Sequence, residues 1–156
     1  MELCVLNAES SVKKRELFKA LEYYHQALEK GISSPDIHQQ MSVLYYHLGF
    51  LDKAIGATQK ALKSVPENDY LHHNLGVLYF ANSNLPKARE HFIKALKINP
   101  GSSHSHYYLA HLFLRQNFPE LANFFAHSAK QLGHPASDLW DLSNNRSPSP
   151  PLTVWV

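Results

Sequence analysis

The chain has 156 residues, of which 44% are hydrophobic, and this is enough to bury the core of one domain. Its 15 basic and 13 acidic residues give a net charge of +2, which is too balanced to indicate nucleic acid or an anionic membrane as a partner. The single cysteine, Cys4, excludes an internal disulfide and favours a reducing, cytoplasmic location. We expect no signal peptide and no membrane insertion, because no apolar run approaches the roughly 20 residues of a transmembrane helix.

Similar residues recur along the chain at a fixed spacing of 34 positions. Two columns contain only alanine: Ala20, Ala54, Ala88 and Ala122, then Ala27, Ala61, Ala95 and Ala129. A third column contains small residues: Ala8, Ser42, Gly76 and Ala110. Small residues at a recurring position indicate that two helix backbones cross closely there. The columns therefore predict a repeated pair of helices.

The first unit, at about 1–34, matches the pattern only in part. Leu3 and Ala8 fit, but Asn7 and Ser11 stand where apolar residues belong. We therefore treat this unit as partial, with a first helix that is frayed, short or incomplete.

The second unit, 35–68, shows the full pattern. Met41, Leu44 and Leu48 lie on one face of a helix. Gly49 breaks that helix, the second helix follows, and Pro66 with Asn68 ends the unit.

The third and fourth units, 69–102 and 103–136, repeat this plan. Asn84 is placed to cap a helix that has Pro86 near its start, where the missing N–H costs nothing. Asn117 and Pro119 mark the same turn in the fourth unit.

Beyond the fourth unit, we predict a short capping helix at 136–143, with Leu139 or Trp140 laid on the last repeat. The segment 144–156 is rich in proline and serine, and we expect it to be disordered or extended.

In its period and in its small, aromatic, alanine and proline columns, the chain resembles the tetratricopeptide repeat (TPR) family over residues 16–133. Tryptophan, which the family favours early in the first helix, is replaced by His38, His72 and His106. The resemblance implies an all-α fold: a right-handed superhelical array of helix-turn-helix repeats, or α-solenoid. It would hold about three full units, the partial first unit and the capping helix, which together form one domain over 1–143.

In such an array the first helix of each pair lines a concave groove, which the resemblance implies is the site for a peptide. The predicted partner-binding residues lie on the face of these helices away from the core: Gln39, Val43, Tyr46, His47, Tyr70, His73, Asn74, Val77, Phe80, His104, Tyr107, Tyr108, His111 and Arg115. Aromatic residues and histidines dominate this set, and aromatic side chains are typical of interaction surfaces. The alternative is that some of them, notably Tyr108, pack between repeats.

Some family members hold the carboxylates of chaperone tails with lysine, asparagine and arginine. Of the corresponding positions here, only Asn74 matches, since the others carry Gln39, Val43, His104 and Tyr108. An apolar, aromatic-rich or helical segment is therefore favoured over an acidic tail.

Eleven histidines raise the question of a metal, but no helical pair is spaced at i, i+4 to chelate one. We predict no metal and no cofactor; the best alternative metal site is His73 with His104 and His111. Histidines in the groove would change binding below about pH 6.5 as they become charged.

The sequence favours a scaffold or adaptor that binds protein, and no motif indicates an enzyme or nucleic-acid binding. Two alternatives remain. One is self-assembly, through the ends of the array or by placing the 146–156 tail in the groove of another copy. The other is an accessory domain of a larger enzyme or secretion complex.

Overall fold

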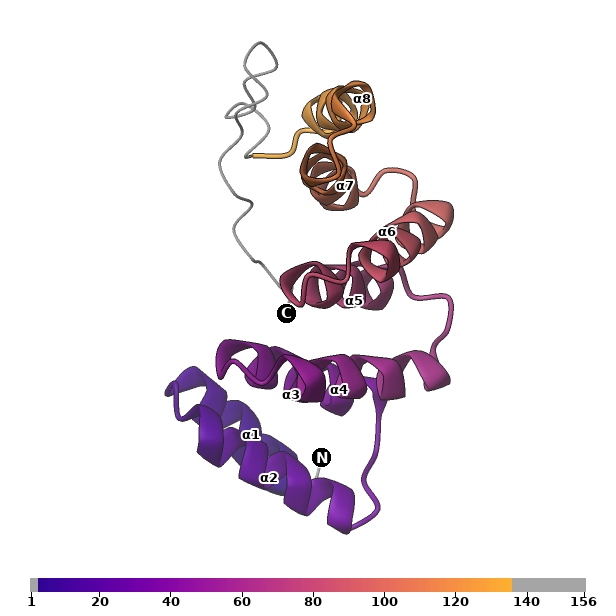
Figure 1. Ribbon diagram of the computed structural model, residues 1–156. Coiled ribbons are helices and arrows are strands. Elements are labelled where there is room, and N and C mark those ends of the chain that lie inside the picture. The colour runs from indigo at the N-terminus through magenta and orange to yellow at the C-terminus, as the bar shows by residue number, and fades with distance from the viewer. Residues whose placement is uncertain (1–2, 136–156) are drawn as a thin grey trace. The chain divides into compact units, whose positions relative to one another are not determined.

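The computed structural model describes residues 3–135, and this part of the chain forms helical hairpins (Figure 1). The helices are α1 (Leu3–Lys13), α2 (Leu17–Glu29), α3 (Pro35–His47), α4 (Leu51–Ser64), α5 (Asp69–Ala81), α6 (Leu85–Ile98), α7 (Ser103–Arg115) and α8 (Pro119–Gln131). Consecutive helices pack in pairs, α1 with α2, α3 with α4, α5 with α6 and α7 with α8. The all-α repeat of helix pairs is therefore confirmed. The predicted capping helix and tail, at 136–143 and 144–156, lie outside the described residues.

The same backbone turn connects the first helix of each pair to the second. Arg15, Gly49, Ser83 and Asn117, spaced 34 positions apart, all have positive φ, between 58° and 81°. In each turn the next amide donates back into the last turn of the helix, as Phe50 does to the Tyr45 carbonyl at 2.8 Å. Glycine adopts this backbone freely, yet it occupies only one of the four positions. The repeat thus imposes the turn even where the residue is unfavourable.

Side-chain caps begin the first helix of each complete unit. Ser34, Asn68 and Ser102 accept a hydrogen bond from the amide three residues later, at 3.2, 2.9 and 3.4 Å. Asn84 caps α6 in the predicted way, accepting from the Lys87 amide at 3.3 Å. These caps restart the helix after each loop, because they satisfy amides that have no partner within the helix.

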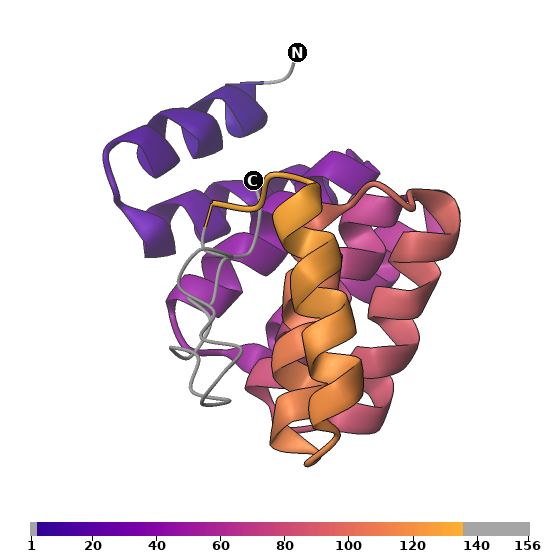
Figure 2. The ribbon, with the colours of Figure 1, turned by 90° about the horizontal axis from the view of Figure 1, so that it is seen from above.

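The chain divides into two compact units. The N-terminal unit, 3–66, contains α1 to α4, and Figure 2 shows the sharp turn from α1 into α2. Its core is one cluster made up of Ala8, Ala20, Leu21, Tyr24, Ile37, Met41, Leu44 and Ala57. Over the described residues α1 is a regular helix, and Ser11 is buried within it.

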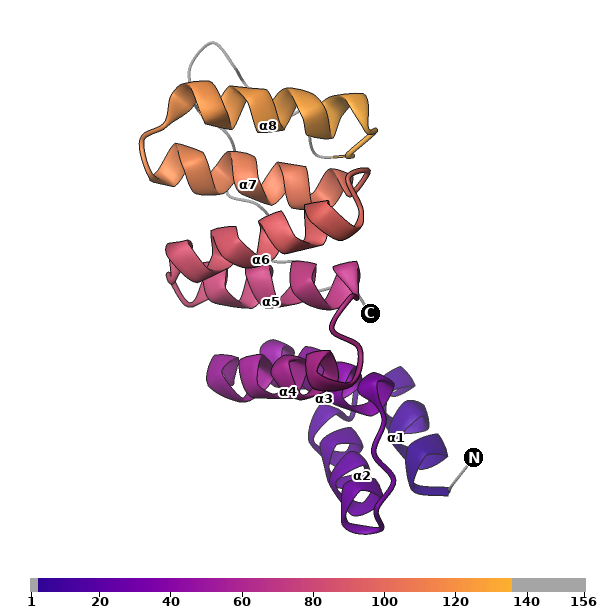
Figure 3. The ribbon, with the colours of Figure 1, turned by 90° about the vertical axis from the view of Figure 1, so that its right-hand side faces the viewer.

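The C-terminal unit, 67–135, contains α5 to α8, which lie one above the other in chain order (Figure 3). Besides the two hairpins, α6 packs on α7 and α5 contacts α7. Its largest fully buried side chains are Leu71, Leu75, Leu78, Phe92, Tyr107, Tyr108, Leu109 and Leu112. This unit brings the first helices of two repeats into contact, which is what a groove face requires.

The alanine columns are sites of close helix packing, as the period predicts. All eight alanines of the two columns are 0% exposed. Gly76, in the column of small residues, lies against Phe92, since a Cβ at Gly76 would approach the ring of Phe92 to 2.6 Å. Among the described residues, no helix is long and apolar enough to cross a membrane.

Candidate functional site

Aromatic and histidine side chains from α5 and α7 meet in the C-terminal unit. The ring of Tyr108 lies 5.6 Å from that of His73 and 5.9 Å from that of Phe80, both on α5. At one end of this row, the guanidinium of Arg115 lies 4.9 Å from the centre of the Phe80 ring. These residues belong to the set that the sequence assigns to the groove face, and the fold brings them together in the C-terminal unit. We call His73, Phe80, His104, Tyr107, Tyr108 and His111 the ring cluster.

His134, which follows α8, joins the ring cluster and was not predicted. Its ring stacks on Tyr107 at 4.2 Å and meets His104 edge-on at 4.6 Å. No column of the repeat contains a histidine at this position, because Pro100 and Pro66 precede it at 34-residue steps. The contact could not be predicted from the repeat, because it depends on how the chain folds back after α8.

A cavity of about 250 Å³ lies beside the ring cluster, at the amino-terminal ends of α5 and α7. Its lining residues are Asp69, Tyr70, His73, Asn99, Gly101, Ser102, Ser103 and His104. Tyr70 is 61% exposed, whereas His73 is 4% exposed. The cavity therefore reaches from an open aromatic side chain to a buried imidazole.

The predicted partner-binding residues differ in their accessibility. His47, Tyr70 and Arg115 are exposed, and Gln39, Tyr46 and His104 are half-buried. The others are buried: Val43, His73, Asn74, Val77, Phe80, Tyr107, Tyr108 and His111. For Tyr108 the reason is clear, since its ring also stacks on Phe92 of α6 at 5.4 Å. The alternative of packing between repeats therefore holds for Tyr108.

Gln39, Val43, Tyr46 and His47 belong to α3 in the N-terminal unit. There the rings of Tyr46 and His47 meet edge-on at 5.8 Å. The described part of the N-terminal unit has no counterpart to the ring cluster, because α1 offers no aromatic side chain to face α3.

Burial keeps the histidines of the ring cluster neutral. Desolvation, with His104 and His134 nearby, lowers the pKa of His73 to about 3. Burial also lowers the pKa of both His111 and His134 to about 4. The expectation that these histidines become charged near pH 6.5 was therefore wrong for the buried ones, because it assumed solvent exposure.

The alternative metal site is not assembled. The rings of His73 and His104 meet edge-on, 6.3 Å apart. Across residues 3–135, no three histidine, cysteine, aspartate or glutamate side chains are arranged to hold a metal ion.

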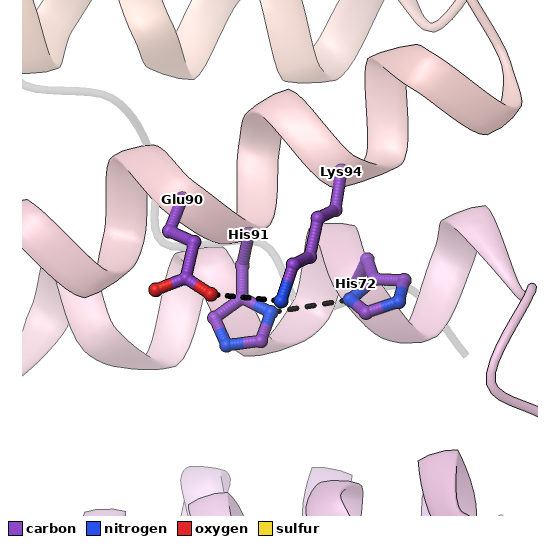
Figure 4. Close-up of polar contacts among 4 residues, drawn as sticks. All are labelled: His72, Glu90, His91 and Lys94. Atoms are coloured by element: carbon purple, nitrogen blue, oxygen red, sulfur yellow. Dashed lines mark hydrogen bonds and ion pairs between the residues drawn. The ribbon is translucent and has the colours of Figure 1, made fainter.

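The histidines that replace the family's tryptophan all form hydrogen bonds. His72 of α5 meets His91 of α6 with 3.1 Å between their Nδ1 atoms, beside the Glu90–Lys94 ion pair (Figure 4). His38 bonds the Ser33 hydroxyl at 3.2 Å, and His106 bonds the Pro100 carbonyl at 3.0 Å. This column is structural, as its recurrence predicts, although only His72 forms its bond across a helix pair.

These features define a class: a protein built from repeated helical hairpins whose first helices carry an aromatic face. Residues 70–102 match the model of the tetratricopeptide repeat family. Together with four hairpins at a 34-residue period, this match makes the chain a tetratricopeptide repeat protein. No curated protein matches the sequence.

Solved TPR structures share the fold at low sequence identity. YrrB, a TPR protein with an unusual peptide-binding site, aligns at a TM-score of 0.75 and 16% identity, over 82% of this chain and 66% of YrrB. PilF of Pseudomonas aeruginosa aligns at a TM-score of 0.75 and 20% identity, over 87% of this chain and 63% of PilF. A TPR protein from Parabacteroides merdae aligns at a TM-score of 0.78 and 18% identity, over 85% of this chain and 53% of the Parabacteroides protein. The chain thus spans less than two thirds of the length of each.

Proposed function

We propose that this TPR domain is a protein-interaction module that binds an extended or helical segment of a partner along the first helices of its repeats. The observation that carries the proposal is the cavity on the α5–α7 face, which opens beside the exposed aromatic ring of Tyr70. Exposed aromatic side chains next to a cavity supply contact area at low entropic cost. The fold shared with YrrB, which has a peptide-binding site, supports the same function.

The charges of this face favour a largely uncharged partner segment. Among the groove residues and the cavity lining, Asp69 and Arg115 carry fixed charge, and the Arg115 guanidinium already lies over Phe80. The buried His73 and His111 stay neutral because burial lowers their pKa. Without a cluster of cations, the face offers little attraction for an acidic tail.

The test compares two aromatic residues of nearly equal exposure, Tyr70 at 61% and Phe124 at 63%. Tyr70 lines the cavity, whereas Phe124 lies on α8 and does not. Tagged Tyr70→Ala and Phe124→Ala variants, both checked for helix content by circular dichroism, would be used as baits, with the bound proteins identified by mass spectrometry.

We expect the Tyr70→Ala bait to lose specific partners that the Phe124→Ala bait retains. If both variants capture the same proteins as the parent chain, the α5–α7 face is not the binding site.

Self-association is the second candidate, because α8 carries a row of exposed apolar side chains. Phe118, Leu121 and Phe124 are 51%, 44% and 63% exposed, and they lie three residues apart on the helix surface. Light scattering would show a concentration-dependent mass that Phe124→Ser reduces. A constant monomer mass in both proteins removes this candidate.

A further inference from the structure

The buried histidine of the cavity has a polar atom that the fold leaves unused. His73 Nδ1 lies 3.0 Å from the Ser105 hydroxyl. Its Nε2 has no hydrogen-bond partner among the residues that the structure describes, although the side chain is only 4% exposed. A buried donor or acceptor without a partner is unfavourable, and it is relieved when a ligand provides one.

The serines around His73 favour one tautomer of its ring. The Ser102 hydroxyl donates to Ser105 Oγ at 2.9 Å, so the Ser105 hydrogen is directed elsewhere. His73 Nδ1 lies within hydrogen-bond distance of Ser105 Oγ and can accept that hydrogen. A neutral imidazole that accepts at Nδ1 carries its hydrogen on Nε2. In this tautomer His73 presents an N–H donor on the side of the ring away from Ser105.

The cavity also contains an acceptor on the same helix. Asp69 and His73 are four residues apart on α5, which places both on one face of the helix, with about 5–6 Å between their Cβ atoms. Asp69 Oδ2 accepts from Asn99 Nδ2 at 2.8 Å, and a carboxylate has further lone pairs to offer. The first amides of α7, at Ser103 and His104, add the positive end of a helix dipole.

We propose that this cavity binds an amide group of the partner, whose carbonyl accepts from His73 Nε2–H and whose N–H donates to the Asp69 carboxylate. An amide carries a donor and an acceptor on opposite sides and has no net charge, which matches one donor and one acceptor bracketing the cavity. The inference rests on the proposed function, since it names the chemical group of the partner that the α5–α7 face would recognise. The amide can come from the partner's main chain or from an asparagine or glutamine side chain.

Small probes test the proposal on the intact chain by nitrogen-15 NMR. N-acetylglycine N-methylamide represents main chain, propionamide represents a carboxamide side chain, and methyl acetate is a carbonyl without an N–H. We expect at least one amide to shift the His73 Nε2 and Ser103 amide resonances, and to bind about fivefold more tightly than the ester. The amide that binds better identifies the source.

Three variants locate the contacts. His73→Phe keeps a ring against Phe92 and Tyr108 and should abolish the amide response. His127→Phe, at an exposed histidine on α8 that does not line the cavity, should leave it unchanged. Asp69 is only half-buried, so Asp69→Ala is less disruptive to folding than a change at His73. It should weaken amide binding about fivefold and leave ester binding unaffected.

Amide and ester binding equally, no shift up to the solubility limit, or a full response in His73→Phe would each overturn the inference. Any of these results, combined with partners that still depend on Tyr70, would leave the proposed function standing. Amide binding without a Tyr70-dependent partner would instead support the amide site and count against the proposed function.

Discussion

The hairpins α3–α4 and α5–α6 use different chemistry at the same helix crossing. In α3–α4 the crossing is polar: Ser42 donates to the Ala54 carbonyl at 2.9 Å and shares a hydrogen bond with Thr58 at 2.6 Å. In α5–α6, 34 residues later, Gly76 leaves space that the ring of Phe92 fills. Helix crossings can therefore be completed by a hydrogen bond between two small side chains or by one large ring against glycine. The repeat does not hold the combined size of the pair constant, since the equivalent residues of the fourth unit are Ala110 and Ala126.

The two compact units also differ in their buried histidines. The C-terminal unit contains His73, His91, His111 and His134, whose pKa values burial lowers to between about 3 and 4. In the described part of the N-terminal unit, His38 alone has a resolved downward pKa shift, caused mainly by burial. The C-terminal unit, which contains the candidate site, therefore also contains the histidines that burial keeps neutral most strongly.

Acid is expected to produce the largest difference between the units. Because the folded pKa of each buried histidine is below the usual value of about 6.5, the unfolded chain binds protons first as the pH falls. Stability should be full above about pH 6.5 and fall by several kcal/mol down to about pH 4, mainly in the C-terminal unit. Amide hydrogen exchange at pH 7 and pH 5 would measure this. Equal loss of protection in α3–α4 and α5–α8 would contradict it.

Removing the ring at the crossing should have the next largest effect. Phe92→Ala leaves a cavity under a 0% exposed side chain, and we expect it to destabilise the C-terminal unit by about 3–5 kcal/mol. The equivalent Thr58→Ala removes a hydrogen bond and should cost about 1 kcal/mol. Urea unfolding of both variants provides the comparison, and equal costs would show that the two crossings do not differ as described.

Adding a methyl group at the small residue should distinguish the crossings further. In Gly76→Ala the new Cβ meets the Phe92 ring at 2.6 Å, and overpacking of about 1–3 kcal/mol outweighs a helix-propensity gain of about 1. Ser42→Ala should cost about 1 kcal/mol or less, because Thr58 still bonds the Ala54 carbonyl. Thermal melts of both variants test the order, and a stabilised Gly76→Ala would refute it.

The smallest expected effect is a gain. Ser83 has φ of 58° at the turn where α3–α4 has Gly49. Ser83→Gly should stabilise the α5–α6 hairpin by about 0.5–1 kcal/mol, because glycine adopts this backbone without strain. The matched control is Gly49→Ser, which should lose a similar amount in urea unfolding. A destabilised Ser83→Gly would mean that the Ser83 side chain contributes to the turn.

The candidate site was predictable as a set of positions but not in its details. The repeat pattern assigned Phe80 and Tyr108 to the first helices of two successive units, α5 and α7, and the structure brings their rings to 5.9 Å. For Tyr108 the sequence left two alternatives, the groove and packing between repeats, and it did not identify Phe92 as the ring on which Tyr108 stacks. Nor did it place His134 on Tyr107, since that contact depends on where the chain goes after α8.

From the sequence alone, the helix pairs, their 34-residue period, their turns and their close crossings were determined, because each follows from residues near one another in the chain or from columns of one period. The tertiary structure alone decided which histidines are buried and neutral, which nitrogen of His73 is left without a partner, and that a cavity forms beside it. These depend on side chains from α5, α6 and α7 converging on one volume. A periodic pattern fixes the positions of residues along helices, but it does not specify what surrounds each atom once the helices pack.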